Sequence, residues 1–149
     1  MRQRTSSRLL TMLLLVGAAG VLSGCAGSDP TPSTIATLEN PQKVTLSEAE
    51  LAVIRRDLGP YIRNAVAEGV ELDVGKAEFS QIQAVSAGGK VYACGYAKAL
   101  NTQIEVMRKL AFTGELVSSS LFLREYIGGN ESQNDFVRAV CAKRGIDLS

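Results

Sequence analysis

The residues with the greatest capacity for chemistry in this sequence are three cysteines, Cys25, Cys94 and Cys141. Histidine is absent, so neither a Ser-His-Asp nor a Cys-His site can be built, and the commonest metal ligand is missing. A zinc site would need four ligands, which cysteines and scattered carboxylates do not supply. The row Ser118–Ser120 would suit only a Ser-Lys hydrolase, and no S-x-x-K spacing accompanies it. We therefore expect a non-enzymatic protein with no metal and no cofactor.

The first cysteine closes an N-terminal export signal. Three arginines precede an apolar run over residues 9–22, and small residues lead from that run to Cys25. The run is shorter than the roughly twenty residues of a membrane-spanning helix. The sequence Leu-Ser-Gly-Cys resembles the lipobox of bacterial lipoproteins. This resemblance implies cleavage after Gly24, a diacylglycerol thioether on Cys25, and usually a further acyl chain such as palmitate on the new amino terminus.

The lipobox resemblance also implies a location. It makes residues 1–24 a lipoprotein signal peptide and places the chain in the bacterial cell envelope. Ala26 follows the cysteine, and by resemblance to the enterobacterial sorting rule the absence of Asp there implies the outer membrane, with the domain facing the periplasm. The alternatives are a plain signal peptide with an accidental cysteine, and display on the outer surface.

The other two cysteines, Cys94 and Cys141, form an even pair in a compartment that oxidises thiols. We therefore predict a disulfide between them. A closed loop of about 47 residues would add roughly 4 kcal/mol of stability by the loop-entropy estimate. The alternative is a redox pair, but thiol-disulfide enzymes favour close spacing such as C-x-x-C. The wide separation favours the structural role.

Charge and composition divide the rest of the chain. Residues 1–24 hold three of the 16 basic residues and none of the 15 acidic ones, so the remainder carries a formal charge of −2. This near-neutral charge, with no basic cluster, argues against a nucleic-acid partner. Over residues 25–46, prolines lie among small and polar residues, which predicts a lipidated, flexible tether. Residues 47–149 are then a single small domain.

The first element of this domain is a predicted helix. Ser47 and Glu50 have the spacing of a capping box, in which each side chain binds the backbone amide of the other. Apolar residues then recur at spacings of three and four, and we expect the helix to run to about Glu68. Gly59-Pro60 lies inside it and removes one amide donor, which predicts a kink or a short break.

Strand-forming segments follow the first helix. They are residues 77–85, 91–97, 104–112 and 118–127. Residues 105–111, taken alone, would also suit a helix. Gly88-Gly89 predicts a hairpin turn between the first two segments, and Gly114 is expected to separate the last two. Asn130 is the predicted cap of a last helix over residues 131–144. The pattern predicts an α+β fold: an N-terminal helix, an antiparallel sheet of about four strands and a C-terminal helix, with both helices on one face.

One stretch of the domain resembles a known family. The segment VYACGYAKALN, residues 91–101, is similar to the V-C-G-x-V-N-A-K-N strand of small, largely uncharacterised exported proteins and lipoproteins of proteobacteria. The matching residues are Cys94, Gly95, Tyr96, Ala99 and Asn101, with Ala77 and Phe79 upstream. The resemblance implies export, a disulfide and an α+β fold, and it carries no catalytic residue.

Together these observations predict a membrane-anchored interaction module. The lipid anchor supplies the membrane contact, and the domain is expected to bind another envelope protein or a cell-wall component. The alternative is a small-ligand binding module in the periplasm. In that case four aromatic residues would line a cleft between the sheet and a helix: Tyr92, Tyr96, Phe122 and Tyr126.

Overall fold

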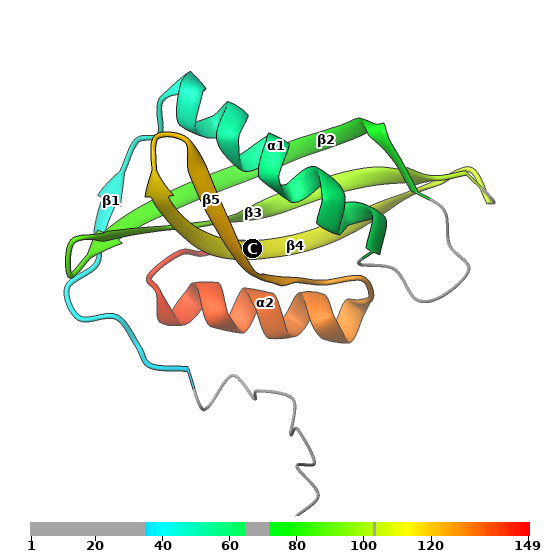
Figure 1. The fold of residues 1–149 in the computed structure, drawn as a ribbon. Helices are drawn as coiled ribbons and strands as arrows, with labels where there is room; N and C mark the ends of the chain where they lie inside the picture. Colours follow the sequence, from blue (N-terminus) through cyan, green and yellow to red (C-terminus); the bar gives the residue numbers. More distant parts are fainter. Residues whose placement is uncertain (1–34, 65–71, 103) are drawn as a thin grey trace, which may run out of the picture.

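A computed structural model describes residues 35–64, 72–102 and 104–149. Within these residues the chain forms two helices and five strands (Figure 1), which confirms the predicted α+β class and corrects the strand number from four to five. No helix in this part of the chain is long and apolar enough to cross a membrane. The elements are β1 (Gln42–Val44), α1 (Glu48–Asn64), β2 (Leu72–Ala87), β3 (Lys90–Asn101), β4 (Val106–Ser118), β5 (Leu121–Ile127) and α2 (Glu131–Lys143).

The five strands form one antiparallel sheet in the order β1-β2-β3-β4-β5. Each strand therefore pairs with its neighbour in the sequence. Gly88 and Gly89 join β2 to β3 with φ angles of 57° and 77°. Positive φ at both central positions suits a two-residue hairpin turn whose twist matches that of the strands. The predicted Gly-Gly turn is confirmed.

The segment predicted as a flexible tether, residues 25–46, is ordered in its second half. β1 pairs with the end of β2, and Val44 packs against the core. Upstream of β1, the Leu38 N–H donates to the Lys143 carbonyl at 3.2 Å, and Lys143 Nζ donates to the Ile35 carbonyl at 2.8 Å. A polar composition did not prevent ordering, because the exposed edge of β2 offered backbone partners. The rest of the predicted tether and the predicted signal peptide lie outside the described residues.

Gly114 does not separate two strands as predicted. It lies within β4, opposite Ala93 of β3 and Arg124 of β5. A Cβ atom at this position would meet the Phe122 ring at 2.5 Å and would come closer still to the Leu123 carbonyl oxygen. Glycine is therefore used here for a close approach between strands, and the turn lies at the two serines that follow β4.

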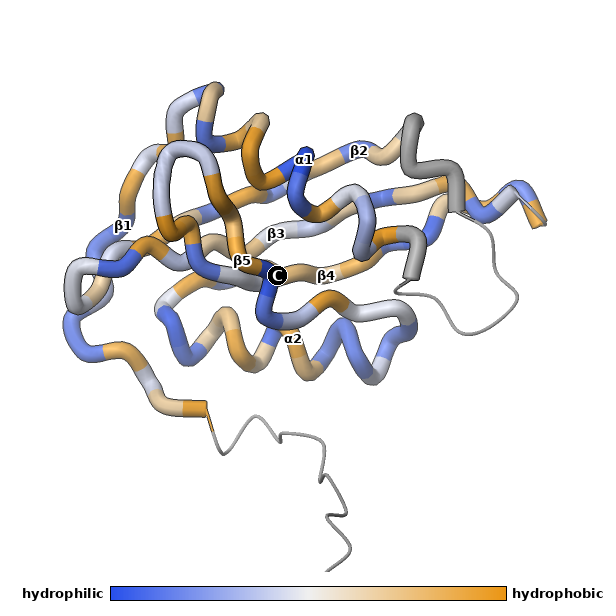
Figure 2. Tube along the Cα trace, viewed as in Figure 1, coloured by the Kyte–Doolittle hydropathy of each residue, from blue (hydrophilic) through white to orange (hydrophobic). Residues whose placement is uncertain are grey.

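The two helices cover opposite faces of the sheet, not one face as predicted. Neighbouring strand residues show this: Phe112 packs on the α1 side and Ala111 on the α2 side. The α1 side is filled by Ile54, Leu58, Ile62, Ala97, Leu110 and Phe112. The α2 side is filled by Val85, Cys94, Tyr96, Ala111, Val137 and Cys141. Apolar and polar residues alternate along both helices, as amphipathic packing requires (Figure 2).

Both helices begin as predicted. The Ser47 amide donates to the Glu50 carboxylate at 2.7 Å, and the Glu50 amide donates to Ser47 Oγ at 3.3 Å, which forms the capping box. The hydrogen bonds that the Glu50 carboxylate accepts from the Ser47 amide and the Ser47 hydroxyl lower the pKa of Glu50. Asn130 Oδ1 accepts from the Gln133 amide at 2.9 Å and caps α2. α1 continues through Pro60 without a break, and its predicted end near Glu68 lies outside the described residues.

Candidate functional site

The predicted disulfide is confirmed. Cys94 on β3 and Cys141 on α2 have their sulfur atoms 2.09 Å and their Cα atoms 6.1 Å apart, and both residues are fully buried. The bond joins the middle of the sheet to the helix that covers it. Cys25, the predicted lipidation site, lies outside the described residues.

A buried cation lies beside the disulfide, and it was not identified from the sequence. Arg144 is only 6% exposed, and its Nη1 donates to Thr113 Oγ1 at 2.6 Å. The Thr113 hydroxyl in turn lies 3.3 Å from the Cys94 sulfur. The guanidinium pairs with Glu125 and lies 4.5 Å from the centroid of the Tyr92 ring. Its charge is therefore balanced inside the domain, which indicates a structural role.

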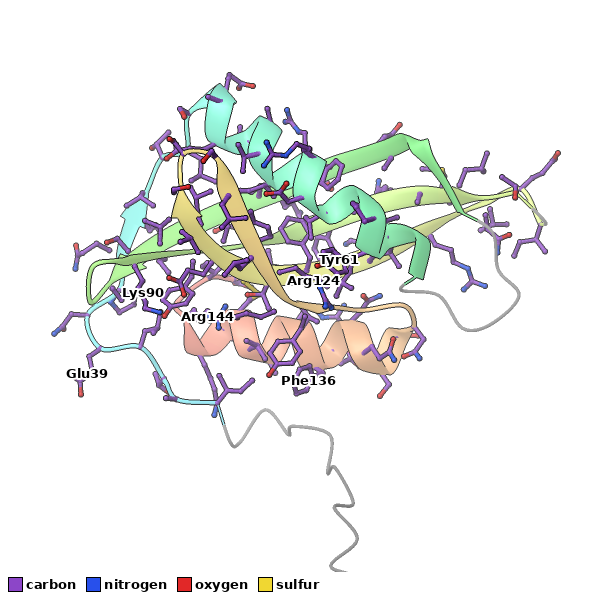
Figure 3. The ribbon with its side chains drawn as sticks, viewed as in Figure 1. Glu39, Tyr61, Lys90, Arg124, Phe136 and Arg144 are labelled. Atoms are coloured by element: carbon purple, nitrogen blue, oxygen red, sulfur yellow. A yellow bond between two sulfur atoms is a disulfide. The ribbon has the colours of Figure 1, made fainter. Side chains whose placement is uncertain are left out.

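A bulge in β5 explains how Glu125 reaches this arginine. β4 pairs Thr113 with Tyr126 and the next residue, Gly114, with Arg124, so Glu125 has no partner opposite it. The extra residue turns Glu125 toward the α2 side of the sheet. Arg124 points to the other side, where its guanidinium lies 4.1 Å from the Tyr61 ring on α1 (Figure 3). Arg144 is also the C-terminal cap residue of α2, where a cation complements the helix dipole.

A second ion pair lies near Arg144 (Figure 3). Lys90 Nζ lies 2.9 Å from the Glu115 carboxylate, and this hydrogen bond raises the pKa of Lys90. Glu115 stands opposite Tyr92 in the β3–β4 register, next to the residues around Arg144. Two ion pairs, Lys90–Glu115 and Arg144–Glu125, thus lie at this end of the sheet.

The four aromatic residues predicted to line a cleft do not come together. Phe122 lies on the α1 side, where its ring centroid is 6.3 Å from that of Phe112. The three tyrosines lie on the α2 side. Tyr96 is 1% exposed, and its hydroxyl donates to the Leu148 carbonyl at 2.7 Å. Core packing therefore accounts for these rings, and the predicted cleft is wrong.

The serine row lies where β4 turns into β5: Ser118 ends β4, and the next two serines form the turn. The hydroxyls of Ser118 and Ser120 lie 3.1 Å apart, and the Ser120 carbonyl accepts from Arg56 at 2.7 Å. A guanidinium keeps its proton throughout the physiological pH range, so it cannot activate a hydroxyl as a base would. In the described ranges, no group of three Cys, Asp or Glu residues is placed to hold a metal ion.

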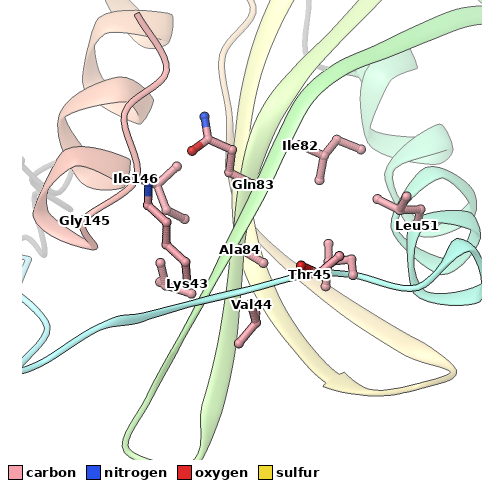
Figure 4. Close-up of a pocket in the computed structure, with 11 residues that line it drawn as sticks. Lys43, Val44, Thr45, Leu51, Ile82, Gln83, Ala84, Gly145 and Ile146 are labelled. Carbon is pink, nitrogen blue, oxygen red and sulfur yellow. The ribbon is translucent and has the colours of Figure 1, made fainter.

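A hollow of about 360 Å³ lies at the β1 edge of the sheet (Figure 4). We call it the edge groove. Its floor is the end of β2 that follows a bulge, and α1 and the segment after α2 form its two sides. The lining residues are Lys43, Val44, Thr45, Leu46, Leu51, Ile82, Gln83, Ala84, Val85, Gly145 and Ile146.

The edge groove exists because β1 is short and β2 is irregular. β1 ends at Val44, opposite Ala84, and the chain then leaves the sheet toward α1. Just before Ala84 the β2–β3 register shifts, and Gln81 adopts a φ of 52°. The bulge brings the Ile82 backbone over Gly95, where a Cβ would lie 3.1 Å from the Ile82 Cα atom. Glycine at position 95 therefore permits the close approach of the bulged β2 backbone.

The lining of the edge groove is apolar on its sides and polar at its rim. Leu51 lies on α1, and Ile146 lies on the opposite side (Figure 4). Leu46, which directly precedes the cap of α1, also lines the groove. Lys43 and Thr45 are exposed at the rim, and Gln83 donates to a backbone carbonyl of the C-terminal segment at 2.7 Å. Such a site can bury an apolar group and hydrogen-bond its surroundings.

We compared the chain with known proteins and found no match. No family model, curated protein or solved structure matches the chain. The resemblance of residues 91–101 to a strand of exported proteobacterial lipoproteins stays a prediction. Function must therefore be inferred from the residues and their geometry.

Proposed function

We propose that this protein is a non-enzymatic lipoprotein of the bacterial cell envelope. Cys25 would carry the lipid, and the domain would lie on the periplasmic side of the outer membrane. The support for the anchor is the sequence: arginines, an apolar run, small residues and then the cysteine. The support for the periplasm is the disulfide pair, which suits an oxidising compartment.

The edge groove is the observation that carries the proposed activity. We infer that it holds an extended segment of another envelope protein. The floor is the edge of β2 beyond the last residue of β1, so a bound segment would continue the line of that short strand. Apolar walls would bury a side chain of that segment, and the rim residues Lys43 and Thr45 would contact its backbone.

The chemistry of the groove favours a protein over a cell-wall glycan. Its walls are aliphatic, and sugar rings are bound through polar contacts that these walls lack. A small apolar ligand is the second candidate, because a volume of about 360 Å³ falls within the roughly 300–1,000 Å³ of small-molecule sites. A photoreactive side chain at the rim would capture a protein in the first case and a small molecule in the second.

The test is cross-linking in cells that make the full chain. A photoreactive amino acid at Lys43 should give a reproducible adduct with one envelope protein. Thr45→Trp fills the groove from an exposed rim position and should abolish that adduct. Thr37→Trp is the matched control, because Thr37 is also exposed but does not line the groove, and it should leave the adduct unchanged. An adduct that survives Thr45→Trp, or no protein adduct at all, would contradict the proposal.

The anchor needs a separate measurement. Mass spectrometry of the protein from its own membranes should find an N-terminal peptide that begins at acylated Cys25. The Cys25→Ser chain should leave the membrane fraction. An unmodified amino terminus would refute the anchor without touching the groove, so the two parts of the proposal can fail independently.

A further inference from the structure

One side of β4 is open over half of its length. β5 pairs with β4 only from Phe112 onward, so residues 106–111 have β3 on one side and no described strand on the other. Near the boundary, Ala111 gives its N–H to Asn134 Oδ1 at 2.7 Å, and its carbonyl accepts from the Gly128 amide at 2.8 Å. Asn134 Nδ2 also donates to the Lys109 carbonyl at 2.9 Å. Asn134 thus takes the place of a strand, and the covered part of the edge ends there.

The alternation of the backbone along β4 identifies the N–H and C=O groups that stay unpaired at the open edge. Residues 107, 109 and 111 point their N–H and C=O groups to the same side of an extended strand, and Ala111 points to the open side. Met107 therefore presents both of its backbone groups at this edge, and Lys109 presents its N–H. The exposed side chains around them are mixed: Glu105, Arg108 and Lys109 are charged, whereas Ile104 is 54% exposed, Val106 49% and Met107 42%. An open edge with exposed apolar side chains is a template for another strand.

We propose that a second copy of this chain pairs with this edge across a two-fold axis at Met107. In an antiparallel pair centred there, Met107 faces Met107 of the second copy, and the two residues exchange two backbone hydrogen bonds. Lys109 then lies beside Glu105 of the second copy, which is in the turn just before β4 and has a φ of 53°. The free Lys109 N–H meets the Glu105 carbonyl, so the unpaired donors find acceptors in this register.

Charge complementarity selects this partner and this register. Glu78, Lys98 and Lys109 stand opposite one another on β2, β3 and β4. Two lysines directly opposite each other repel. Lys109 Nζ lies 3.6 Å from the centroid of the Tyr96 ring and forms no ion pair with a described residue. Glu105 of the second copy brings a carboxylate to the open side of Lys109, and the two-fold axis makes this contact twice.

The position of the edge leaves the rest of the molecule free. The β3–β4 hairpin projects at the end of the sheet away from β1 (Figure 1). The edge groove, which lies beside β1, is therefore not covered by the second copy. Pairing through β4 and binding in the groove are independent properties.

The test uses a cysteine at the two-fold axis, in cells that make the full chain. Met107→Cys should give a disulfide-linked dimer, seen at twice the monomer mass without reductant. Hydrogen-bonded neighbours in an antiparallel pair have Cα atoms about 5.5 Å apart, within the roughly 4.4–6.8 Å of disulfides. The native Cys94 and Cys141 are already paired. Val106→Cys is the matched control: Val106 is as exposed as Met107 but faces Arg108 of the second copy.

The proposed register predicts further cross-linking results. Val106→Cys alone should give no dimer, whereas chains with Val106→Cys and chains with Arg108→Cys should cross-link when made together. Glu105→Lys should reduce the Met107→Cys dimer, and addition of Lys109→Glu should restore it. Equal dimer from Met107→Cys and Val106→Cys would mean random collision and would overturn the proposal. No dimer from Met107→Cys, or a dimer indifferent to Glu105→Lys, would overturn it as well.

Discussion

Removal of the disulfide between Cys94 and Cys141 should cost much of the stability of the domain. The bond closes a loop with a sequence separation of 47 residues, for which loop-closure entropy gives about 4 kcal/mol. Both residues are fully buried, so alanine at each position also loses packing. Against a total of about 5–15 kcal/mol for a small domain, this is a large fraction.

Urea unfolding followed by circular dichroism measures this loss. The Cys25→Ser chain is the reference, because it removes the lipidation site and keeps the pair. Cys94→Ala with Cys141→Ala in that background should lower the midpoint by roughly 2 M, since the free energy falls by about 1–3 kcal/mol per molar urea for small proteins. Reduction of the reference protein should give a similar shift. A shift below about 0.5 M would refute the loop-closure reasoning.

Two further predictions concern β4 and the start of β5. Gly114→Ala should lower the stability by about 1–3 kcal/mol or more, because its Cβ would overlap the Leu123 carbonyl and the Phe122 ring; an unchanged thermal midpoint would show that the strands adjust freely. Asp57 accepts hydrogen bonds from Arg56 and from the Phe122 amide, and these lower its pKa. Because the folded-state pKa is depressed, the stability it contributes is present above its ordinary pKa of about 3.9 and is lost as the pH falls through the folded value. Asp57→Asn should therefore destabilise the domain by about 1–3 kcal/mol at neutral pH, and the difference should vanish in acid unfolding titrations; a difference that persists at low pH would contradict this.

Local signals in the sequence predicted local structure well. The capping residues Ser47 and Asn130 and the Gly88-Gly89 turn each act within a few residues of the chain, so their patterns could be recognised without knowledge of the fold. The disulfide could be predicted because only two cysteines remain once Cys25 is assigned to lipid.

The missed features depend on contacts between distant segments. β1, Gln42–Val44, has only three residues, of which two are polar, and it is ordered by the edge of β2 some forty residues later. Gly114 looked like a turn because glycine signals both a turn and a close approach. Arg144 meets Glu125 only because a bulge in β5 turns that carboxylate inward.

The arrangement of the helices did leave a signal in the sequence. Along VYACGYAKAL nearly every residue is small, apolar or aromatic, which is typical of a strand covered on both faces. Residues 93–97 are indeed buried without alternation. The prediction that both helices cover one face overlooked this continuous run of apolar residues, which indicates that the strand is covered on both faces.

The hydrogen bonds that tie residues 35–38 to the end of α2 have a mechanical consequence. If Cys25 is anchored as proposed, any pull from the membrane enters the domain at Ile35 and Leu38, where both are bound to Lys143. Lys143 lies two residues from Cys141, and the disulfide passes the load directly to the middle of β3. In the oxidised domain the Cys94–Cys141 bond would therefore hold α2 on the sheet under force. In a reduced domain α2 would detach from the sheet first.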